Sequence, residues 1–176
     1  MSKTKSKVPL KTKLISIFLP MGIGLGLSLY VKYKVLLPVS ITNVYMEPTL
    51  KQGETKYFSK WFRKDNLGIG DVVICHSPSD PNSYFIARII GKPGDSISIQ
   101  KRFVFRNGTI LDPTLFPEPA TQNIPLIPQG KTEHDDMNPI TVPEKTFFLL
   151  ADNREMGVDS RILGPIQESQ IFAVLW

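Results

Sequence analysis

Hydrophobic residues follow two different patterns along this chain, and the change falls near residue 35. Residues 14–31 form a run of 18 residues without a charge, most of them apolar. After residue 35 the apolar residues come in short runs separated by Pro, Gly, Asn and Asp. A run of 18 lies at the short end of the roughly 17–25 residues that cross a bilayer as a helix, whereas short runs bounded by turn residues are typical of strands.

Six segments after the long run are predicted to be β-strands, because they are rich in Val, Ile and Phe and end at turn residues. They are 71–75, 83–90, 96–100, 103–105, 146–150 and 171–176. Asn107 and Gly108 are typical of a two-residue hairpin turn, and the proline-rich stretch 111–143 is expected to be largely irregular. The pattern predicts a mostly β domain, a coiled barrel or sandwich of short antiparallel strands, preceded by one N-terminal transmembrane helix.

The charge of the chain is concentrated beside the apolar run. The 176 residues include 21 Lys+Arg and 16 Asp+Glu, which gives a formal charge of +5 and a pI near 9.3. Five lysines precede the run and two follow it, whereas the remainder from residue 36 carries 14 basic and 16 acidic residues. The excess therefore indicates a lipid bilayer as partner and no nucleic acid, with the N-terminus in the cytoplasm by the positive-inside rule.

This distribution predicts three parts: a basic cytoplasmic tail over 1–13, a transmembrane anchor over 14–31 and an exported β domain over 35–176. A cleaved signal peptide is the alternative, but Ser28-Leu29-Tyr30 is a poor match to a small-x-small cleavage site. One cysteine excludes an intramolecular disulfide, and with only two histidines we expect neither a metal site nor a cofactor. The sequence leaves the oligomeric state open.

Four segments after the apolar run carry recognisable motifs. They are 45–50 (YMEPTL), 70–73 (GDVV), 86–95 (IARIIGKPGD) and 151–154 (ADNR) with 159–161 (DSR) and Gly164 just after it. In order and spacing they resemble the motifs of bacterial type I signal peptidases. The resemblance implies a membrane-anchored, mostly β protein on the outer face of the bacterial cytoplasmic membrane, with exported polypeptides or signal peptides as partners.

Members of that family cleave with a serine immediately before the Met-x-Pro-Thr-Leu stretch and a lysine immediately before the Arg of the third segment. A serine needs an adjacent base, and a lysine can be that base only when its pKa is lowered. This chain has Tyr45 at the serine position and Ala87 at the lysine position. We therefore expect both to be non-catalytic.

Further departures surround these two positions. The resemblance places Asn43 on the oxyanion side, where a small residue is usual, Ala151 at a glycine, and Gly157 at a serine that orients the lysine. The residues that the family uses as structural support behind the site are present: they are Asp152, Arg154, Asp159 and Arg161. The scaffold is thus expected to remain without the proton-transfer groups.

The family binds its substrate as an added strand, and here the walls of that groove would be 39–45 and 84–87. We expect Asn43, Val44, Met46 and Ile86 to line it, with Tyr45 partly filling the pocket for the scissile residue. The alternative is that Tyr45 closes the groove.

Other groups could in principle replace the lost chemistry. They are Thr42, Cys75, His76, Lys92 and His134. A lone cysteine in a strand is more often a buried hydrophobe, and His76 and His134 are expected at the surface. Thr42 and Lys92 are predicted to lie too far from the site.

The first functional hypothesis is therefore a membrane-anchored pseudoenzyme that binds an exported polypeptide without cutting it. In lacking both catalytic residues, the chain resembles signal-peptidase-like assembly factors of some Gram-positive pilus operons. The alternative is an active type I signal peptidase with a non-standard nucleophile. A third hypothesis is a membrane-surface module, because residues 56–64 (KYFSKWFRK) interleave aromatic and basic side chains.

Overall fold

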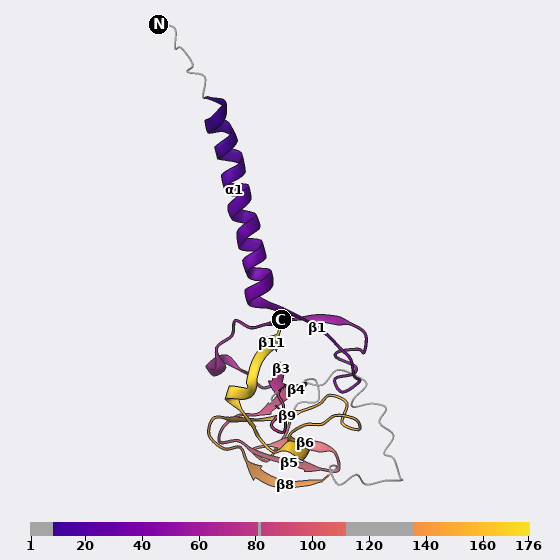
Figure 1. Cartoon of the computed structure of the whole chain (residues 1–176). Coiled ribbons are helices and arrows are strands. Elements are labelled where there is room, and N and C mark those ends of the chain that lie inside the picture. Colours follow the sequence, from indigo (N-terminus) through magenta and orange to yellow (C-terminus); the bar gives the residue numbers. More distant parts are fainter. Residues whose placement is uncertain (1–8, 81, 112–135) are drawn as a thin grey trace.

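The computed structural model describes residues 9–80, 82–111 and 136–176. Its first element is α1 (Leu10–Tyr30), which stands clear of the remaining structure (Figure 1). The segment Lys11–Tyr30 has a mean hydropathy of 1.6 and none of it is buried. By length and composition this helix can cross a membrane, and it includes residues 14–30 of the predicted anchor. A π-helical turn, η1 (Val31–Val35), leads directly from it into the first strand.

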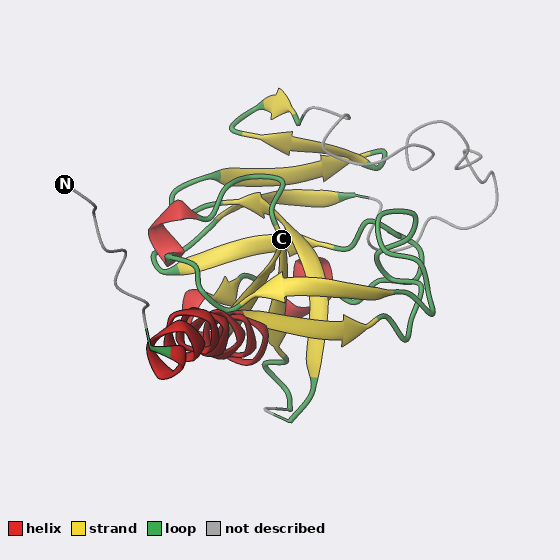
Figure 2. Ribbon diagram, turned by 90° about the horizontal axis from the view of Figure 1, so that it is seen from above, coloured by secondary structure: helices red, strands yellow, loops and turns green. Residues whose placement is uncertain are grey.

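The described residues after α1 form two antiparallel sheets, as the sequence predicted. The first has seven strands in the order β1–β2–β11–β3–β4–β9–β10. These are β1 (Leu36–Ser40), β2 (Thr55–Ser59), β3 (Val72–His76), β4 (Tyr84–Gly91), β9 (Thr146–Leu150), β10 (Ile166–Gln167) and β11 (Ile171–Leu175). The second sheet, β7–β6–β5–β8, lies against one side of the first (Figure 2). Its strands are β5 (Ser96–Gln100), β6 (Phe103–Arg106), β7 (Thr109–Ile110) and β8 (Met137–Thr141).

Three short helical turns complete the fold: η2 (Lys64–Asn66), α2 (Ser160–Leu163) and η4 (Glu168–Gln170). The predicted hairpin is confirmed, since Asn107 and Gly108 have φ of 52° and 77° between β6 and β7, as a type I′ turn requires. The strand β8 lies in the stretch 111–143, which was expected to be irregular, and so corrects that expectation for its own residues. Residues 112–135 lie outside the described part.

Two strands that the sequence did not predict, β1 and β2, close one end of the first sheet. Pro38 lies in the middle of β1, and a proline within an apolar segment argues against a strand. Proline is tolerated there because β1 is the outermost strand in the order, so one of its edges needs no ladder donor. β1 pairs with β2 from Leu36 opposite Ser59 to Ser40 opposite Thr55. It starts at the foot of α1 and runs off to one side of it (Figure 1).

Alternation along the strands divides the core into three clusters. The site-side core consists of Val39, Ile41, Met46, Leu50, Phe58, Val72, Ile74, Ala151 and Ala173. The rear core, on the other face of β3 and β4, consists of Leu67, Val73, Cys75, Ala87, Ile89, Phe147, Leu149, Ile166 and Ile171. The inter-sheet core consists of Ile90, Ile97, Ile99, Val104, Val142, Phe148 and Leu150.

Gly91 ends β4 where the two sheets meet, and a side chain there would not fit. A Cβ at this position would lie 2.8 Å from Ile97 Cγ1 and 3.1 Å from Val142 Cγ2. We predict that Gly91→Ala lowers the free energy of unfolding by about 1–3 kcal/mol, since overpacking a close-packed core has that cost. Urea unfolding of the full chain in detergent micelles, followed by the β-sheet signal in far-ultraviolet circular dichroism, measures the change.

The matched control for this prediction is Gly68→Ala, where the nearest atom to the added Cβ is Asp71 Oδ2 at 3.6 Å, an ordinary contact. Its effect should stay within about 0.5 kcal/mol. Equal stability of the Gly91→Ala variant and the parent protein would contradict the tight contact between the sheets.

Candidate functional site

Strand β4 carries the central residues of the site on its two faces. Ala87 is fully buried in the rear core, and its methyl group has no ionisable atom. Ile86 and Arg88 point to the opposite face, where Ile86 packs against the site-side core. The predicted lysine position is therefore an apolar place in the interior.

Arg88 forms a buried ion pair that joins three parts of the chain. Its Nε donates to Asp152 Oδ1 at 2.8 Å, and its Nη2 donates to Asp152 Oδ2 and, at 3.0 Å, to Thr49 Oγ1. The Thr49 hydroxyl also donates to Asp152 Oδ2, and Arg88 Nη1 donates to the Gly70 carbonyl at 2.8 Å. Thr49 follows β1, Arg88 lies on β4 and Asp152 follows β9, so this network fixes the loops around the site. Thr49 belongs to the YMEPTL segment, but nothing in its sequence neighbourhood indicates that it bonds to Arg88 and Asp152.

The segment after β1 turns rather than continuing as a strand. Residues 43–49 form turns, with the Glu47 amide donating to the Val44 carbonyl at 3.1 Å and the Leu50 amide to the Met46 carbonyl at 2.8 Å. The expected wall over 39–45 is therefore extended only as far as Ser40 and is a folded loop beyond it. Met46 is buried in the site-side core, whereas Tyr45 is half-buried.

Asn43 and Asn153 hold the backbone at Tyr45. The Tyr45 amide donates to Asn43 Oδ1 at 3.1 Å. The Asn153 amide donates to the Tyr45 carbonyl at 2.9 Å, and Asn153 Nδ2 donates to the Val44 carbonyl at 3.1 Å. In a serine peptidase the amide of the nucleophile can donate to the oxyanion of the transition state. Here the Tyr45 amide already donates to the Asn43 side chain of its own loop.

Ala151 and Gly157 lie against each other. A Cβ added at Gly157 would fall 2.1 Å from Ala151 Cβ and 2.9 Å from the Asn153 carbonyl oxygen. The methyl group of Ala151 thus occupies the space that a side chain at 157 would need. The residues at 151 and 157 are therefore complementary in size, a methyl group against a glycine.

Asp159 and its neighbours support the end of β9 from behind. Asp159 Oδ2 accepts from the Ala151 amide at 2.9 Å, and its carboxylate accepts from Arg161 Nε and Nη2, each at 2.9 Å. Ser160 Oγ accepts from the Leu149 amide at 2.9 Å. Burial, together with the positive charge of Arg161, lowers the pKa of Arg154 to about 10, so Arg154 stays protonated at neutral pH.

The turn between β5 and β6 of the second sheet contacts the loop over 151–159. Lys101 and Arg102 both have positive φ, at 50° and 73°, between β5 and β6. This unusual backbone for non-glycine residues directs Arg102 to an ion pair with Glu155. The loop over 151–159 is therefore held from both sheets.

The first half of β4 has an open edge. The partner β9 pairs with Arg88, Ile89 and Gly91 of β4, and in the described part of the chain no strand pairs with 84–87 on that side. Ile89 exchanges hydrogen bonds on the β3 side, with the Gly70 amide and the Asp71 carbonyl, each at 2.8 Å. By antiparallel alternation the backbone N–H and C=O groups of Tyr84 and Ile86 then face the open edge.

The groups considered as replacement nucleophiles or bases lie elsewhere. Cys75 is fully buried on β3, and burial raises the pKa of its thiol well above the usual range, which disfavours the thiolate. His76 ends β3 and contacts an aromatic ring, whereas Thr42 is exposed with its carbonyl bonded to Gln52. His134 lies outside the described residues. Among the described residues, no group of three or more His, Cys, Asp or Glu is placed to hold a metal ion.

Comparison with known proteins gives the family. The sequence model of signal peptidase, peptidase S26, matches residues 14–175. The chain belongs to this family. A signal peptidase I of Bacillus amyloliquefaciens is 28% identical over 180 residues, which cover 97% of this chain and 90% of that protein. Signal peptidase IB of Staphylococcus aureus (strain Mu50) is 27% identical over 168 residues, which cover 92% of this chain and 87% of that protein.

A solved structure shares the fold. The crystal structure of a signal peptidase I from Enterococcus faecalis V583 aligns with a TM-score of 0.53 at 22% identity, covering 63% of this chain and 97% of that chain. Membership of the peptidase S26 family confirms the resemblance carried by the four motif segments. The assignments of Tyr45 and Ala87 to the two catalytic positions remain predictions within that family.

The contact between Ala151 and Gly157 makes a quantitative prediction. We expect Gly157→Ser to lower the free energy of unfolding by about 3 kcal/mol, the upper end of overpacking costs, because the new Cβ meets the Ala151 methyl group. Ala151→Gly in the same chain should restore most of this loss, giving a coupling energy of about 1–3 kcal/mol between the two positions. Urea unfolding of the parent, both single variants and the double variant measures the cycle. Additive effects of the two substitutions would be incompatible with the contact.

Proposed function

We propose that this protein is a catalytically inactive member of the signal peptidase family that binds an exported polypeptide or signal peptide as an added β-strand. The observation that carries the proposal is the combination of Tyr45 and a fully buried Ala87 at the two dyad positions with an open edge on β4. Peptide binding at such an edge needs only backbone hydrogen bonds and side-chain pockets. Proton transfer needs a base, and Ala87 offers none.

The proposed site lies between the loop over 41–46 and the edge of β4 at Tyr84 and Ile86. Ile86 is partly buried and packs against the site-side core, which contains Ile41 and Met46, so it is the apolar side chain that this core presents beside the edge. Ile86 supplies one N–H and one C=O at the edge, and Tyr84 supplies another of each. An extended peptide therefore bonds to β4 through alternate residues only. The proposed cargo is an exported surface polypeptide, including pilus subunits, consistent with the resemblance to dyad-lacking assembly factors.

The inactivity part of the proposal rests on several features of the same site. The Tyr45 amide is bonded to Asn43 Oδ1, and the Ala151 methyl group fills the place of an orienting serine at 157. The Cys75 thiol is buried away from solvent. The alternative, an active signal peptidase, requires a nucleophile at another position. No contact among the described residues favours one.

The protein is further proposed to sit in a bacterial cytoplasmic membrane with α1 as its anchor, residues 1–13 in the cytoplasm and the β domain on the outer face. The segment around residue 60 and the C-terminus support this placement, because both lie close to the base of α1, where Figure 1 marks the C-terminus. The Lys60 amide donates to the Val35 carbonyl at 2.8 Å, and the Trp176 amide donates to the Tyr57 carbonyl at 3.2 Å. Trp61 and Trp176 are 79% and 84% exposed there. Exposed tryptophan with nearby lysine is typical of a membrane interface.

Trp61 is thus not a core residue, and Phe62 packs against the rear core instead. The segment 56–64 supplies one half of this interface and the C-terminus supplies the other. We propose this contact as an orienting surface for the anchored domain, which keeps the open edge of β4 in a fixed relation to the membrane.

The binding proposal predicts that the full chain in lipid nanodiscs binds a fluorescein-labelled signal-peptide analogue ending in a small-x-small sequence and leaves it intact. Fluorescence anisotropy measures binding, and mass spectrometry of the peptide after incubation measures cleavage. N-methylation of alternate peptide residues should abolish binding in one register and spare it in the other, because only every second N–H faces β4.

Cleavage of the analogue by the unmodified protein would support the active alternative and refute the pseudoenzyme. A matched series tests the reason for inactivity. The variant Tyr45→Ser with Ala87→Lys should remain inactive, whereas adding Ala151→Gly and Gly157→Ser should permit measurable cleavage, since the four changes restore both the dyad and the space it needs. Full activity in the two-site variant would show that positions 151 and 157 are not an obstacle.

The membrane proposal predicts that both tryptophans contact lipid. The chain has two tryptophans, so Trp61→Phe leaves Trp176 as the sole reporter and Trp176→Phe leaves Trp61. In vesicles with brominated acyl chains each reporter should be quenched, and aqueous iodide should quench each less than it quenches free tryptophan. Strong iodide quenching with no bromine quenching would place that residue in water and refute its part in the interface.

A further inference from the structure

Three aromatic rings form a row across the end of the first sheet, beyond the proposed groove. The row consists of His76 on β3, Tyr84 on β4 and Phe172 on β11, here called the aromatic platform. The ring centroids of His76 and Phe172 are 4.4 Å apart, and those of Tyr84 and Phe172 are 6.4 Å apart in an edge-on arrangement. Tyr84 is 54% exposed, so the platform presents ring surface to solvent.

A β-bulge places Phe172 in this row. Ile171 pairs with Cys75 and Ala173 pairs with Ile74, so the register shifts by one residue between them. As a result, Ile171 faces the rear core while Phe172 and Ala173 both face the site side. Bulges commonly redirect a side chain in this way, and here the redirected side chain is the one that contacts His76.

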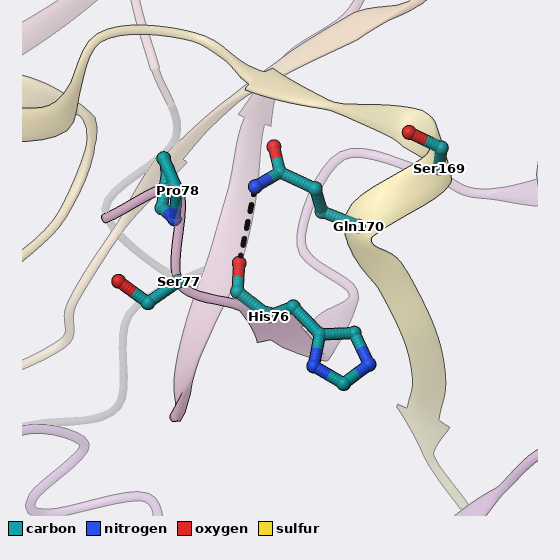
Figure 3. A pocket seen from close by; sticks show the side chains of 5 residues that line it. All are labelled: His76, Ser77, Pro78, Ser169 and Gln170. Atoms are coloured by element: carbon teal, nitrogen blue, oxygen red, sulfur yellow. Dashed lines mark hydrogen bonds between the residues drawn. The ribbon is translucent and has the colours of Figure 1, made fainter. Parts of the chain in front are cut away.

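The contact between the start of β11 and the end of β3 is reinforced next to the platform. Gln170 Nε2 donates to the His76 carbonyl at 3.3 Å. Figure 3 shows this hydrogen bond on one side of His76 and the imidazole directed away from it. A shallow cavity of about 350 Å³ adjoins it, lined by His76, Ser77, Pro78, Ser169 and Gln170. Two of the three strands that carry the platform, β3 and β11, are therefore held together at their ends.

The platform is continuous with the open edge of β4. Tyr84 belongs to both, because its ring contacts Phe172 while its backbone N–H and C=O face the open edge. Ile86, two residues along β4 on the same face, packs against the site-side core. A strand added beside β4 would thus carry one side chain past Ile86 and the next side chain of the same face past Tyr84.

The position of the platform separates it from the membrane interface. Phe172 lies near the start of β11 and Trp176 follows its end. Four residues of strand span roughly 13 Å, so the platform and the tryptophan surface occupy opposite ends of the same strand. A polypeptide strand covers the platform more readily than a lipid surface does.

We propose that the aromatic platform is a specificity subsite that accepts an aromatic or proline side chain of the bound exported polypeptide, two residues from the one beside Ile86. This inference rests on the proposed strand-binding function. Stacking and edge-on contacts between rings add attraction beyond the burial of apolar area. Proline in extended ligands packs its compact apolar ring against aromatic side chains. The subsite makes the groove selective for a sequence feature outside the small-x-small segment.

The test uses the full chain in nanodiscs and the fluorescein-labelled signal-peptide analogue, with a guest residue of Tyr, Pro, Ala or Asp placed at each position in turn. At one position we expect Tyr and Pro to bind about five- to tenfold more tightly than Ala. Tyr84→Ala and His76→Ala should remove this preference while changing the affinity of the Ala guest less than twofold. Tyr84→Phe and His76→Phe, which keep the rings, should retain it.

Phe103→Ala is the matched control, because Phe103 is 58% exposed on the second sheet and lies outside the platform. It should leave the guest preference unchanged. Binding of all guests with equal affinity, or a preference that survives both Tyr84→Ala and His76→Ala, would overturn the subsite and leave the strand-binding function standing. Absence of binding by every guest peptide would overturn the strand-binding function itself and the subsite with it.

Discussion

The guanidinium of Arg88 and the carboxylate of Asp152, with the Thr49 hydroxyl between them, hold the loops of this protein in place around one strand. Arg88 is 8% exposed and Asp152 is 2% exposed, so both charges depend on each other for their hydrogen bonds. Removing one partner of a buried pair leaves an uncompensated charge, which costs about 3–5 kcal/mol. The pair joins β4 to the segments after β1 and β9. It therefore constrains the geometry of the site by joining three segments of the chain.

Around this fixed frame, apolar side chains fill the interior near the motif positions. The methyl group of Ala151 takes the volume opposite Gly157, and Ala87 fills a place in the rear core with carbon. The Tyr45 amide is bonded within its own loop. In the described chain no strand pairs with Tyr84 and Ile86 at the outer edge of β4, so their backbone groups are available to a partner. Under the proposed function, this edge is the binding surface that remains when the proton-transfer residues are replaced.

The local pattern of apolar and turn residues predicted the central strands. It did not predict the edge strand β1 or the bulge in β11. Apolar runs rich in Val, Ile and Phe predicted β3, β4, β5, β6, β9 and β11, and Gly, Pro, Asn or Asp mark an end of most of them. Pro38 concealed β1, since a proline is acceptable only where the strand has a free edge, which the sheet order decides. Ile171 and Ala173 are two residues apart, as on one face of a regular strand, yet they face opposite cores because the bulge lies between them. That register depends on β3, almost a hundred residues earlier in the chain.

The sequence by itself determined the distribution of charge around one apolar run, the family motifs and the residue types at 45 and 87, because each of these is a property of neighbouring positions. Only the tertiary structure decided that Ala151 meets Gly157, that Asn43 occupies the Tyr45 amide, that 84–87 of β4 is unpaired on one side in the described chain, and that His76, Tyr84 and Phe172 form one row. Some of these contacts join distant segments, as in the row of His76, Tyr84 and Phe172, and others depend on how a loop folds back on itself, as at Ala151 and Gly157. They follow from how the strands pair and where the bulge falls, which are set by the packing of the whole sheet and by no single segment of it.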